Sequence, residues 1–164
     1  MFHTQLEAAK KGFVTDEMKV VARKECIPEE RLRDLVAAGQ VVIPCNRNHT
    51  SIDPEGIGKA LRTKINVNLG TSRDVTDYDS EMEKVNWAIQ LGAESIMDLS
   101  THGDTSIFRR KLIESSPAMI GTVPIYDSVI HHQKDLGELT AQDFLDTIRL
   151  HAQDGVDFIT IHSG

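Results

Sequence analysis

Lys64-Ile-Asn-Val-Asn-Leu69 is the first of four short, largely apolar runs that decide the fold of this 164-residue chain. The other three are Ser95-Ile-Met-Asp-Leu99, Met119-Ile-Gly-Thr-Val123 and Phe158-Ile-Thr-Ile161. Each run has the length and the residue types of a buried β-strand. Because segments with helical periodicity separate them, the runs predict parallel strands joined by right-handed helical crossovers.

The segments between the runs carry helix signals at their ends. Asp79 or Ser80 can cap the first helix, Asp104 or Thr105 the second, and Thr140 the third, which we expect to end at Gly155. The predicted apolar positions are Met82, Val85, Trp87, Ala88 and Ile89 in the first helix, Ile107, Phe108, Leu112 and Ile113 in the second, and Phe144, Leu145, Ile148 and Leu150 in the third.

Residues 1–60 have a different pattern, which we interpret as an N-terminal helical cap followed by a loop. Proline near the start and glycine at the end mark the clearest of its helices. The predicted elements are helices over Gln5–Gly12, Asp16 to about Lys24 and Pro28–Gly39, a short strand over Gln40–Pro44, and a loop over Asn46–Gly58.

The alternation from residue 61 onward resembles part of a barrel. A (β/α)8 barrel needs eight strands and typically ~250 residues, and its active site lies at the carboxyl ends of the strands. We therefore predict an α/β fold in which an N-terminal helical cap precedes the first four β/α units of a TIM-type (β/α)8 barrel, with residues 61–164 forming an incomplete first half. Because open sheet edges recruit further strands, we expect a homo-oligomer or a second chain that supplies the missing half.

Composition excludes several classes of function. The net charge is −7 and 40% of the residues are hydrophobic, which argues against nucleic-acid or anionic-membrane binding, although Arg62 with Lys64, or Arg109-Arg110-Lys111, could form a local phosphate pocket. No run approaches the ~20 apolar residues of a membrane span. The N-terminus lacks signal-peptide features and the two cysteines, Cys26 and Cys45, fit no metal-ligand spacing, so we expect a cytoplasmic protein with reduced cysteines.

Polar residues near the ends of the first two strands are candidates for a site. Asn66 and Asn68 alternate with apolar residues, so both amides point to one face of the strand, where they could bind a ligand or form a buried hydrogen-bonded pair. Asp98 could be a general base or a ligand orienter, but capping of the following loop is the favoured interpretation. Met97 on its own is typical of core packing.

The last two strands end near a tyrosine and a histidine. Gly121-Thr-Val-Pro-Ile-Tyr126 predicts a proline-fixed turn that projects Tyr126, whose hydroxyl could bind a phosphate or ribose or stay in water. His162 follows the last strand and suits proton transfer or metal binding as well as packing. By contrast, His131, His132 and His151 fall on predicted helices, and we expect them to face solvent.

Common catalytic motifs are absent from the sequence, but longer strings resemble one family. There is no Cys-x-x-Cys, glycine-rich phosphate loop, His-Glu-x-x-His or Gly-x-Ser-x-Gly. In residues, order and spacing, five strings resemble the thiamin-pyrimidine synthase (ThiC) family, and the resemblance extends over nearly the whole chain. The strings are Ile43-Pro-Cys-Asn-Arg-Asn-His49, Arg62-Thr-Lys-Ile-Asn-Val-Asn-Leu-Gly-Thr-Ser72, Ala93-Glu-Ser-Ile-Met-Asp-Leu-Ser-Thr101, Ile120-Gly-Thr-Val-Pro-Ile-Tyr126 and Asp154-Gly-Val-Asp-Phe-Ile-Thr-Ile-His162.

The resemblance implies a radical S-adenosylmethionine lyase that converts aminoimidazole ribotide into the hydroxymethylpyrimidine phosphate of thiamin. In the family pattern, Asn68, Met97, Tyr126 and His162 line the ribotide site. A sister group, the hydroxybenzimidazole synthases of anaerobic cobamide synthesis, uses the same substrate and remains an alternative, as does a non-catalytic half barrel that binds a phosphorylated ligand or a partner chain. His102 stands where the family begins a turn with glycine.

The resemblance also implies cofactors. The family uses a [4Fe–4S] cluster, S-adenosylmethionine and zinc, and its cluster motif and zinc histidines lie downstream of residue 164. Cys26 and Cys45 cannot replace the three cluster thiolates. We therefore expect this polypeptide alone to hold neither metal centre and to be inactive.

Overall fold

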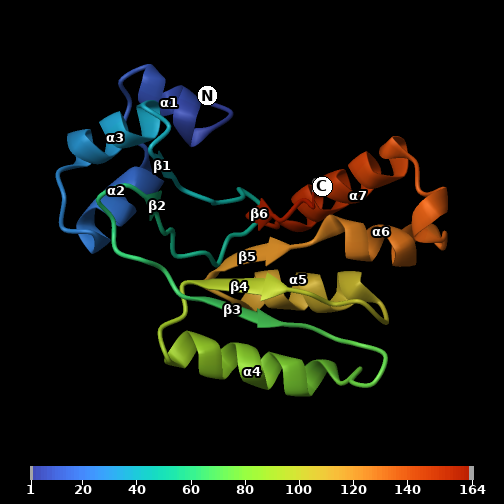
Figure 1. Cartoon of the computed structure of the whole chain (residues 1–164). Helices are drawn as coiled ribbons and strands as arrows, with labels where there is room; N and C mark the ends of the chain where they lie inside the picture. The colour runs from blue at the N-terminus through green and yellow to red at the C-terminus, as the bar shows by residue number, and fades with distance from the viewer. Residues whose placement is uncertain (1, 163–164) are drawn as a thin grey trace. The chain divides into compact units, whose positions relative to one another are not determined.

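The computed structural model describes residues 2–162, which form two units (Figure 1). The first unit comprises residues up to Pro44 together with Asp53–Lys64, and the second comprises Cys45–Ile52 together with residues from Ile65 onward. The short segment Cys45–Ile52 therefore belongs with the barrel-like part of the chain. The division predicted from sequence, after residue 60, stays a prediction.

The first unit is a small helical layer with one pair of short strands. Its elements are α1 (Gln5–Lys10), α2 (Asp16–Lys24), α3 (Glu29–Ala37), β1 (Val41–Val42) and β2 (Ile57–Gly58). Thr4 and Thr15 accept hydrogen bonds from backbone N–H groups of the first turns of α1 and α2, as N-caps do. The core of the unit includes Ala8, Met18, Val21, Leu32 and Val36, all fully or almost fully buried.

Three details of the first unit differ from the sequence prediction. Pro28 is the N-cap of α3 and lies just before the helix. The strand predicted over Gln40–Pro44 is only two residues long. β2 falls inside the predicted loop and pairs antiparallel with β1, with Val41 opposite Gly58. A two-residue strand is defined by its pairing partner and carries no periodicity, so no local pattern predicts it.

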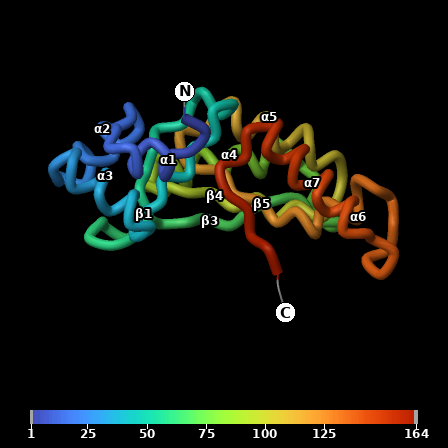
Figure 2. The backbone as a smooth tube through the Cα atoms, turned by 90° about the horizontal axis from the view of Figure 1, so that it is seen from above, coloured from blue at the N-terminus to red at the C-terminus, as the bar shows by residue number. Residues whose placement is uncertain are grey.

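The second unit contains the predicted parallel sheet. Its strands are β3 (Asn66–Leu69), β4 (Ser95–Asp98), β5 (Met119–Thr122) and β6 (Phe158–Ile159), hydrogen-bonded in that order and all parallel. The connecting helices are α4 (Tyr78–Gln90), α5 (Thr105–Ser115), α6 (Pro124–His132), the short 3-10 helix η1 (Leu136–Glu138) and α7 (Ala141–Asp154). Figure 2 traces the backbone from above, with β3, β4, β5 and α4 to α7 labelled. Sequential parallel strands with helical crossovers are the arrangement of a partial barrel, which confirms the predicted fold class.

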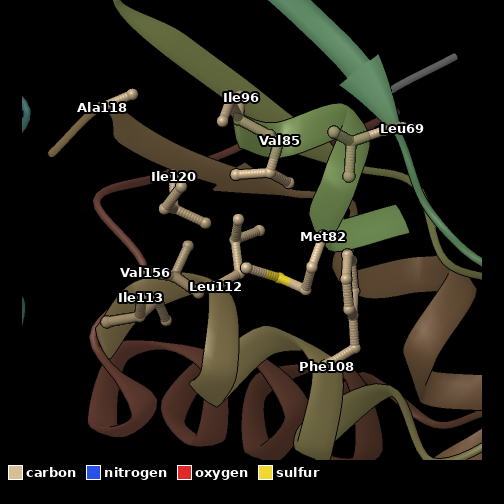
Figure 3. Packing of buried hydrophobic residues seen from close by; sticks show 10 residues of the cluster. All are labelled: Leu69, Met82, Val85, Ile96, Phe108, Leu112, Ile113, Ala118, Ile120 and Val156. Atoms are coloured by element: carbon tan, nitrogen blue, oxygen red, sulfur yellow. The ribbon is translucent and has the colours of Figure 1, made fainter. Parts of the chain in front are cut away.

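One face of this sheet packs against helices α4 and α5. The cluster in Figure 3 joins strand residues such as Leu69, Ile96 and Ile120 to helix residues such as Val85 and Leu112. Because neighbouring residues of a strand point to opposite faces, the residues between these strand positions face the other side of the sheet. That other side carries the candidate site.

The helix ends follow the predicted signals closely. Asp104 caps α5, Thr140 caps α7 in a capping box with Asp143, and Gly155 ends α7 in the left-handed region with φ of 110°. The cap of α4 is Asp77, two residues before the first predicted candidate.

Three predicted apolar-face residues are wrong: Trp87, Ile107 and Leu145 are exposed. Trp87 follows the buried Val85 by two residues, which places it about 200° around the helix and away from the sheet. The sequence prediction had assigned Trp87 to the buried face only because its side chain is apolar. Among the described residues, no helix is long and apolar enough to cross a lipid bilayer.

Candidate functional site

Polar side chains line the face of the sheet that lies opposite the helices. The Asn66 Nδ2 group donates a hydrogen bond to Asn68 Oδ1 at 2.8 Å, and Ser95 Oγ donates to Asn66 Oδ1 at 2.9 Å. The two asparagines thus share one face, as predicted. Both are exposed, however, and not buried, because helices cover only the opposite face of the sheet.

Met97 continues this face on the neighbouring strand. It pairs in register with Asn68 on one side and with Gly121 on the other. Met97 is half-buried, and the Thr160 hydroxyl lies 4.0 Å from its sulfur. The ring of Phe158 occupies the space above Gly121, where an added Cβ would lie only 2.3 Å from the ring atom Cζ. The row from Asn68 to Phe158 therefore forms one layer across the sheet, with glycine making room for the aromatic ring.

Tyr126 and His162 lie close together beyond the ends of β5 and β6. Their rings have centroids 5.9 Å apart and planes tilted by 35°. We predicted that a proline-fixed turn projects Tyr126. Instead, Pro124 begins helix α6, and Tyr126 lies in the first turn of that helix. Proline is favoured at the first helical position, so Pro124 was a signal for the helix. Both side chains are exposed.

The four predicted site residues therefore form two neighbouring pairs, Asn68 with Met97 and Tyr126 with His162. Asn68 and Met97 are the next-to-last residues of β3 and β4, and Tyr126 and His162 follow β5 and β6. All four are therefore near the carboxyl ends of the strands, where parallel β/α folds place their ligands. The sequence analysis singled out these four but missed Ser95 and Thr160, which contact Asn66 and Met97 on the same face. Ser95 lies two residues before Met97, and Thr160 two before His162. Because alternate residues of a strand share a face, this spacing could have indicated both.

Asp98 faces the helix-covered side of the sheet and is buried. Its Oδ1 accepts hydrogen bonds from the backbone N–H of Ser100 at 2.9 Å and from the Ser100 hydroxyl at 2.6 Å. Burial raises the pKa of Asp98, and the hydrogen bonds from Ser100 oppose this rise. These contacts match the capping role that the sequence analysis favoured.

Arg109 is the largest fully buried side chain described. Its Nη1 lies 3.2 Å from Asp127 Oδ2, and its Nε and Nη2 lie 2.9 and 2.8 Å from Asp154 Oδ2. One guanidinium on α5 therefore joins the start of α6 to the end of α7. Two carboxylates compensate the buried charge, as the low polarity of the interior requires.

His151 completes this buried network, so the prediction that it faces solvent is wrong. It is only 1% exposed; its Nε2 lies 2.8 Å from Asp127 Oδ2 and its Nδ1 2.8 Å from Thr122 Oγ1. The Thr105 hydroxyl also donates to Asp127. Burial alone would raise the pKa of Asp127, but the hydrogen bonds from His151 and Thr105 and the charge of Arg109 lower it to about 2.

A second buried pair lies at the amino ends of the strands. His49 Nδ1 lies 2.7 Å from Asp157 Oδ2, and its Nε2 lies 2.8 Å from the Ser116 carbonyl. Asp157 also accepts from the backbone N–H groups of Asn46 and Ile120, each at 2.8 Å. Burial alone would lower the pKa of His49, but the hydrogen bond and charge of Asp157 raise it above its ordinary value. Because a carbonyl and a carboxylate only accept, both ring nitrogens donate and the ring is cationic.

The basic residues considered for a phosphate pocket are engaged elsewhere. In the first unit, Lys64 pairs with Glu25, and Arg62 lies 3.2 Å from Glu55. In the second, Lys111 pairs with Asp79 at 2.8 Å, Arg109 is buried as described, and Arg110 bonds Ser106. The carboxylates neutralise most of the charge that a phosphate would need.

The described residues do not fit a metal centre. No group of three or more His, Cys, Asp or Glu side chains in residues 2–162 could hold a metal ion. The two cysteines lie apart in the chain, Cys26 exposed in the first unit and Cys45 half-buried in the second. A cluster held by three thiolates therefore has no ligand set in this part of the chain.

Comparison with known proteins decides the family. A family model described as "Radical SAM ThiC family" matches residues 4–164. The chain belongs to the ThiC family. Its 163 matched residues, 99% of the chain, are 58% identical to a phosphomethylpyrimidine synthase of Pelotomaculum thermopropionicum, 56% to one of Clostridium novyi and 57% to one of Clostridioides difficile. This ThiC-family chain spans only 37–38% of the length of those relatives.

Proposed function

We propose that this chain forms the front, ribotide-binding part of a phosphomethylpyrimidine synthase. The reaction is the conversion of aminoimidazole ribotide into hydroxymethylpyrimidine phosphate for thiamin. The observation that carries the proposal is the arrangement of Asn68, Met97, Tyr126 and His162 at the carboxyl ends of four consecutive parallel strands. The 58% identity to a relative of that name supports the same assignment.

Each of the four side chains has a distinct part in this proposal. The Asn68 amide, the Tyr126 hydroxyl and the His162 imidazole hydrogen-bond the ribotide, whose phosphate, hydroxyl and ring-nitrogen atoms offer several acceptors. Met97 supplies an adaptable apolar surface for the imidazole ring of the ligand. The ring contact between Tyr126 and His162 holds these two groups next to each other before the ligand arrives.

The radical chemistry of the family requires groups that the described residues do not hold. We propose that the ligands of the [4Fe–4S] cluster and of zinc lie outside these 164 residues, since no described set of side chains fits them. S-adenosylmethionine would bind at that cluster. The contribution of this chain is then to bind and orient the ribotide.

Ribotide binding gives the test of the proposed site. Tyr126→Phe and His162→Gln are each expected to weaken binding of aminoimidazole ribotide roughly tenfold, about 1.4 kcal/mol. The first removes the hydroxyl, and the second replaces the rigid imidazole with a flexible amide whose polar atoms lie elsewhere. Isothermal titration calorimetry on the purified chain measures the change. His131→Gln, an exposed histidine on α6, is the matched control and should leave the Kd unchanged. Equal affinity in all four proteins would refute the assignment of Tyr126 and His162.

The open edges of the sheet lead to a prediction about assembly. β3 and β6 are the outer strands of the four-stranded sheet in the second unit, and within residues 2–162 no strand pairs with the outer side of either. Unpaired strand edges recruit further strands. We expect the sedimentation coefficient of the chain to rise with concentration in analytical ultracentrifugation, as the edges pair between copies. A monomer throughout the range would show that the edges are protected.

A further inference from the structure

We propose that Ser95 and Asn66 form a hydrogen-bond relay that fixes the orientation of the Asn68 amide, so that Asn68 offers its Nδ2 donor to a ligand. Ser95 and Asn66 are then positioning residues, and Asn68 recognises an acceptor atom. The inference rests on the proposed function, because it concerns the same strand ends. It goes further by naming which end of the amide faces the ligand and what holds it there.

The direction of the relay begins at Ser95. This residue is buried at 4% exposure, and its hydroxyl donates to Asn66 Oδ1 at 2.9 Å. An amide oxygen only accepts, so the opposite end of the Asn66 amide is its donor. That donor, Nδ2, lies 2.8 Å from Asn68 Oδ1. The bond from Ser95 therefore determines which end of the Asn66 amide donates, and the bond from Asn66 determines which end of the Asn68 amide accepts.

The last member of the relay has an unused donor. With its Oδ1 occupied by Asn66, the Asn68 amide keeps its Nδ2 group available, and none of the hydrogen bonds found among residues 2–162 uses it. Asn68 is exposed on the open face and stands beside Met97 in register. The amide thus points a donor at the place where the strand-end site begins.

Holding the amide in advance has a physical consequence for affinity. An exposed asparagine without fixed neighbours can turn its amide by 180° and exchange donor for acceptor, and a ligand must then select one state. A preorganised amide avoids this ordering loss on binding. The relay also imposes specificity, because a ligand atom that can only donate a hydrogen bond would face another donor.

Two substitutions test the relay at different points. Ser95→Ala removes the first donor without touching the strand-end site, and we expect it to weaken aminoimidazole ribotide binding roughly 3- to 10-fold. Asn68→Asp keeps the oxygen that accepts from Asn66 but replaces the offered donor with a carboxylate oxygen, so we expect more than a tenfold loss. Ser115→Ala, at an exposed serine on α5, is the matched control and should bind like the unchanged chain.

A second measurement reads the relay without any ligand. In ¹⁵N-resolved NMR spectra, the side-chain NH2 signals of Asn66 and Asn68 can be assigned from Asn66→Asp and Asn68→Asp. Ser95→Ala should shift both pairs of signals and make the Asn66 NH2 protons exchange faster with water, while Ser115→Ala should leave them in place. Should Ser95→Ala fail to fold, Asn66→Ala on the exposed face must shift the Asn68 signals instead.

The outcomes separate this inference from the proposed function. Loss of ribotide binding in Ser95→Ala together with shifted Asn68 signals supports the relay. Unchanged Asn68 signals in a folded Ser95→Ala protein overturn it, whatever the affinity. If the unchanged chain binds no ribotide but the NMR shifts appear, the relay stands and the proposed ribotide site fails. Where the unchanged chain does bind ribotide, titration with ribose 5-phosphate distinguishes an acceptor on the sugar phosphate, which shifts the Asn68 NH2 signals, from one on the imidazole ring, which ribose 5-phosphate lacks.

Discussion

Asp127→Ala is expected to lower the free energy of unfolding by about 3–5 kcal/mol, the range for removing one partner of a buried ion pair. Asp127 accepts hydrogen bonds from Thr105, Arg109 and His151. Alanine would leave all three donors buried, and one of them, the guanidinium of Arg109, carries a full charge. Asp154 would still compensate part of that charge at 2.8 Å.

Urea denaturation followed by circular dichroism measures this change. Asp146→Ala on α7 is the control, because Asp146 is exposed and bonds to the exposed side chains of Arg149 and Gln142 on the same helix, and we expect a change within about 0.5 kcal/mol. The pKa of Asp127 is lowered to about 2, so its contribution is complete above its ordinary value of 3.8 and is lost as the pH falls toward 2. An Asp127→Ala protein as stable as the control would show that the network adds no net stability.

Asp157→Ala is expected to have an effect of similar size, about 3–5 kcal/mol, at the opposite end of the strands. Asp157 accepts hydrogen bonds from the His49 ring and from the backbone N–H groups of Asn46 and Ile120. Its loss would leave the buried His49 ring and two backbone N–H groups without their acceptor. Chemical denaturation measures the loss, and Asp79→Ala, at an exposed carboxylate on α4, provides the comparison.

The pH dependence identifies the histidine in this pair. The pKa of His49 is raised in the folded state. The stability from its charged form is therefore fully present below the unfolded pKa of about 6.5 and is lost as the pH rises through the folded pKa. We expect the unfolding free energy to fall over that range and His49→Gln to abolish this fall. An unchanged slope in His49→Gln would assign the titration to another group.

Much of the barrel-like unit could be predicted because its signals are local. Four apolar runs marked the four strands, and Thr140 and Gly155 marked the ends of α7. Such signals depend on backbone hydrogen bonding and φ within a few residues. The pairing of β2 with β1 depends on residues distant in the sequence, so local patterns missed it. Trp87 was misplaced because its apolar character was followed, although helical spacing from Val85 turns it outward.

The candidate site was predictable only in part. Alternation placed Asn66 and Asn68 on one face, and the family resemblance supplied the four strand-end residues. His151 was misplaced because a histidine on a helix is ordinarily exposed, and nothing near it in sequence indicates that Asp127 and Thr122 surround it. Partners 24 and 29 residues away are brought together only by the fold.

The segment Cys45–Ile52 has a consequence for any attempt to divide this protein. It belongs to the second unit, although the residues on both sides of it belong to the first. A shortened chain beginning at Leu61 would contain every strand of the parallel sheet but would lack Asn46 and His49. Asp157 would then lose its partner His49. Supplying residues 45–52 as a separate peptide should restore stability to such a chain, as a removed piece restores a split protein.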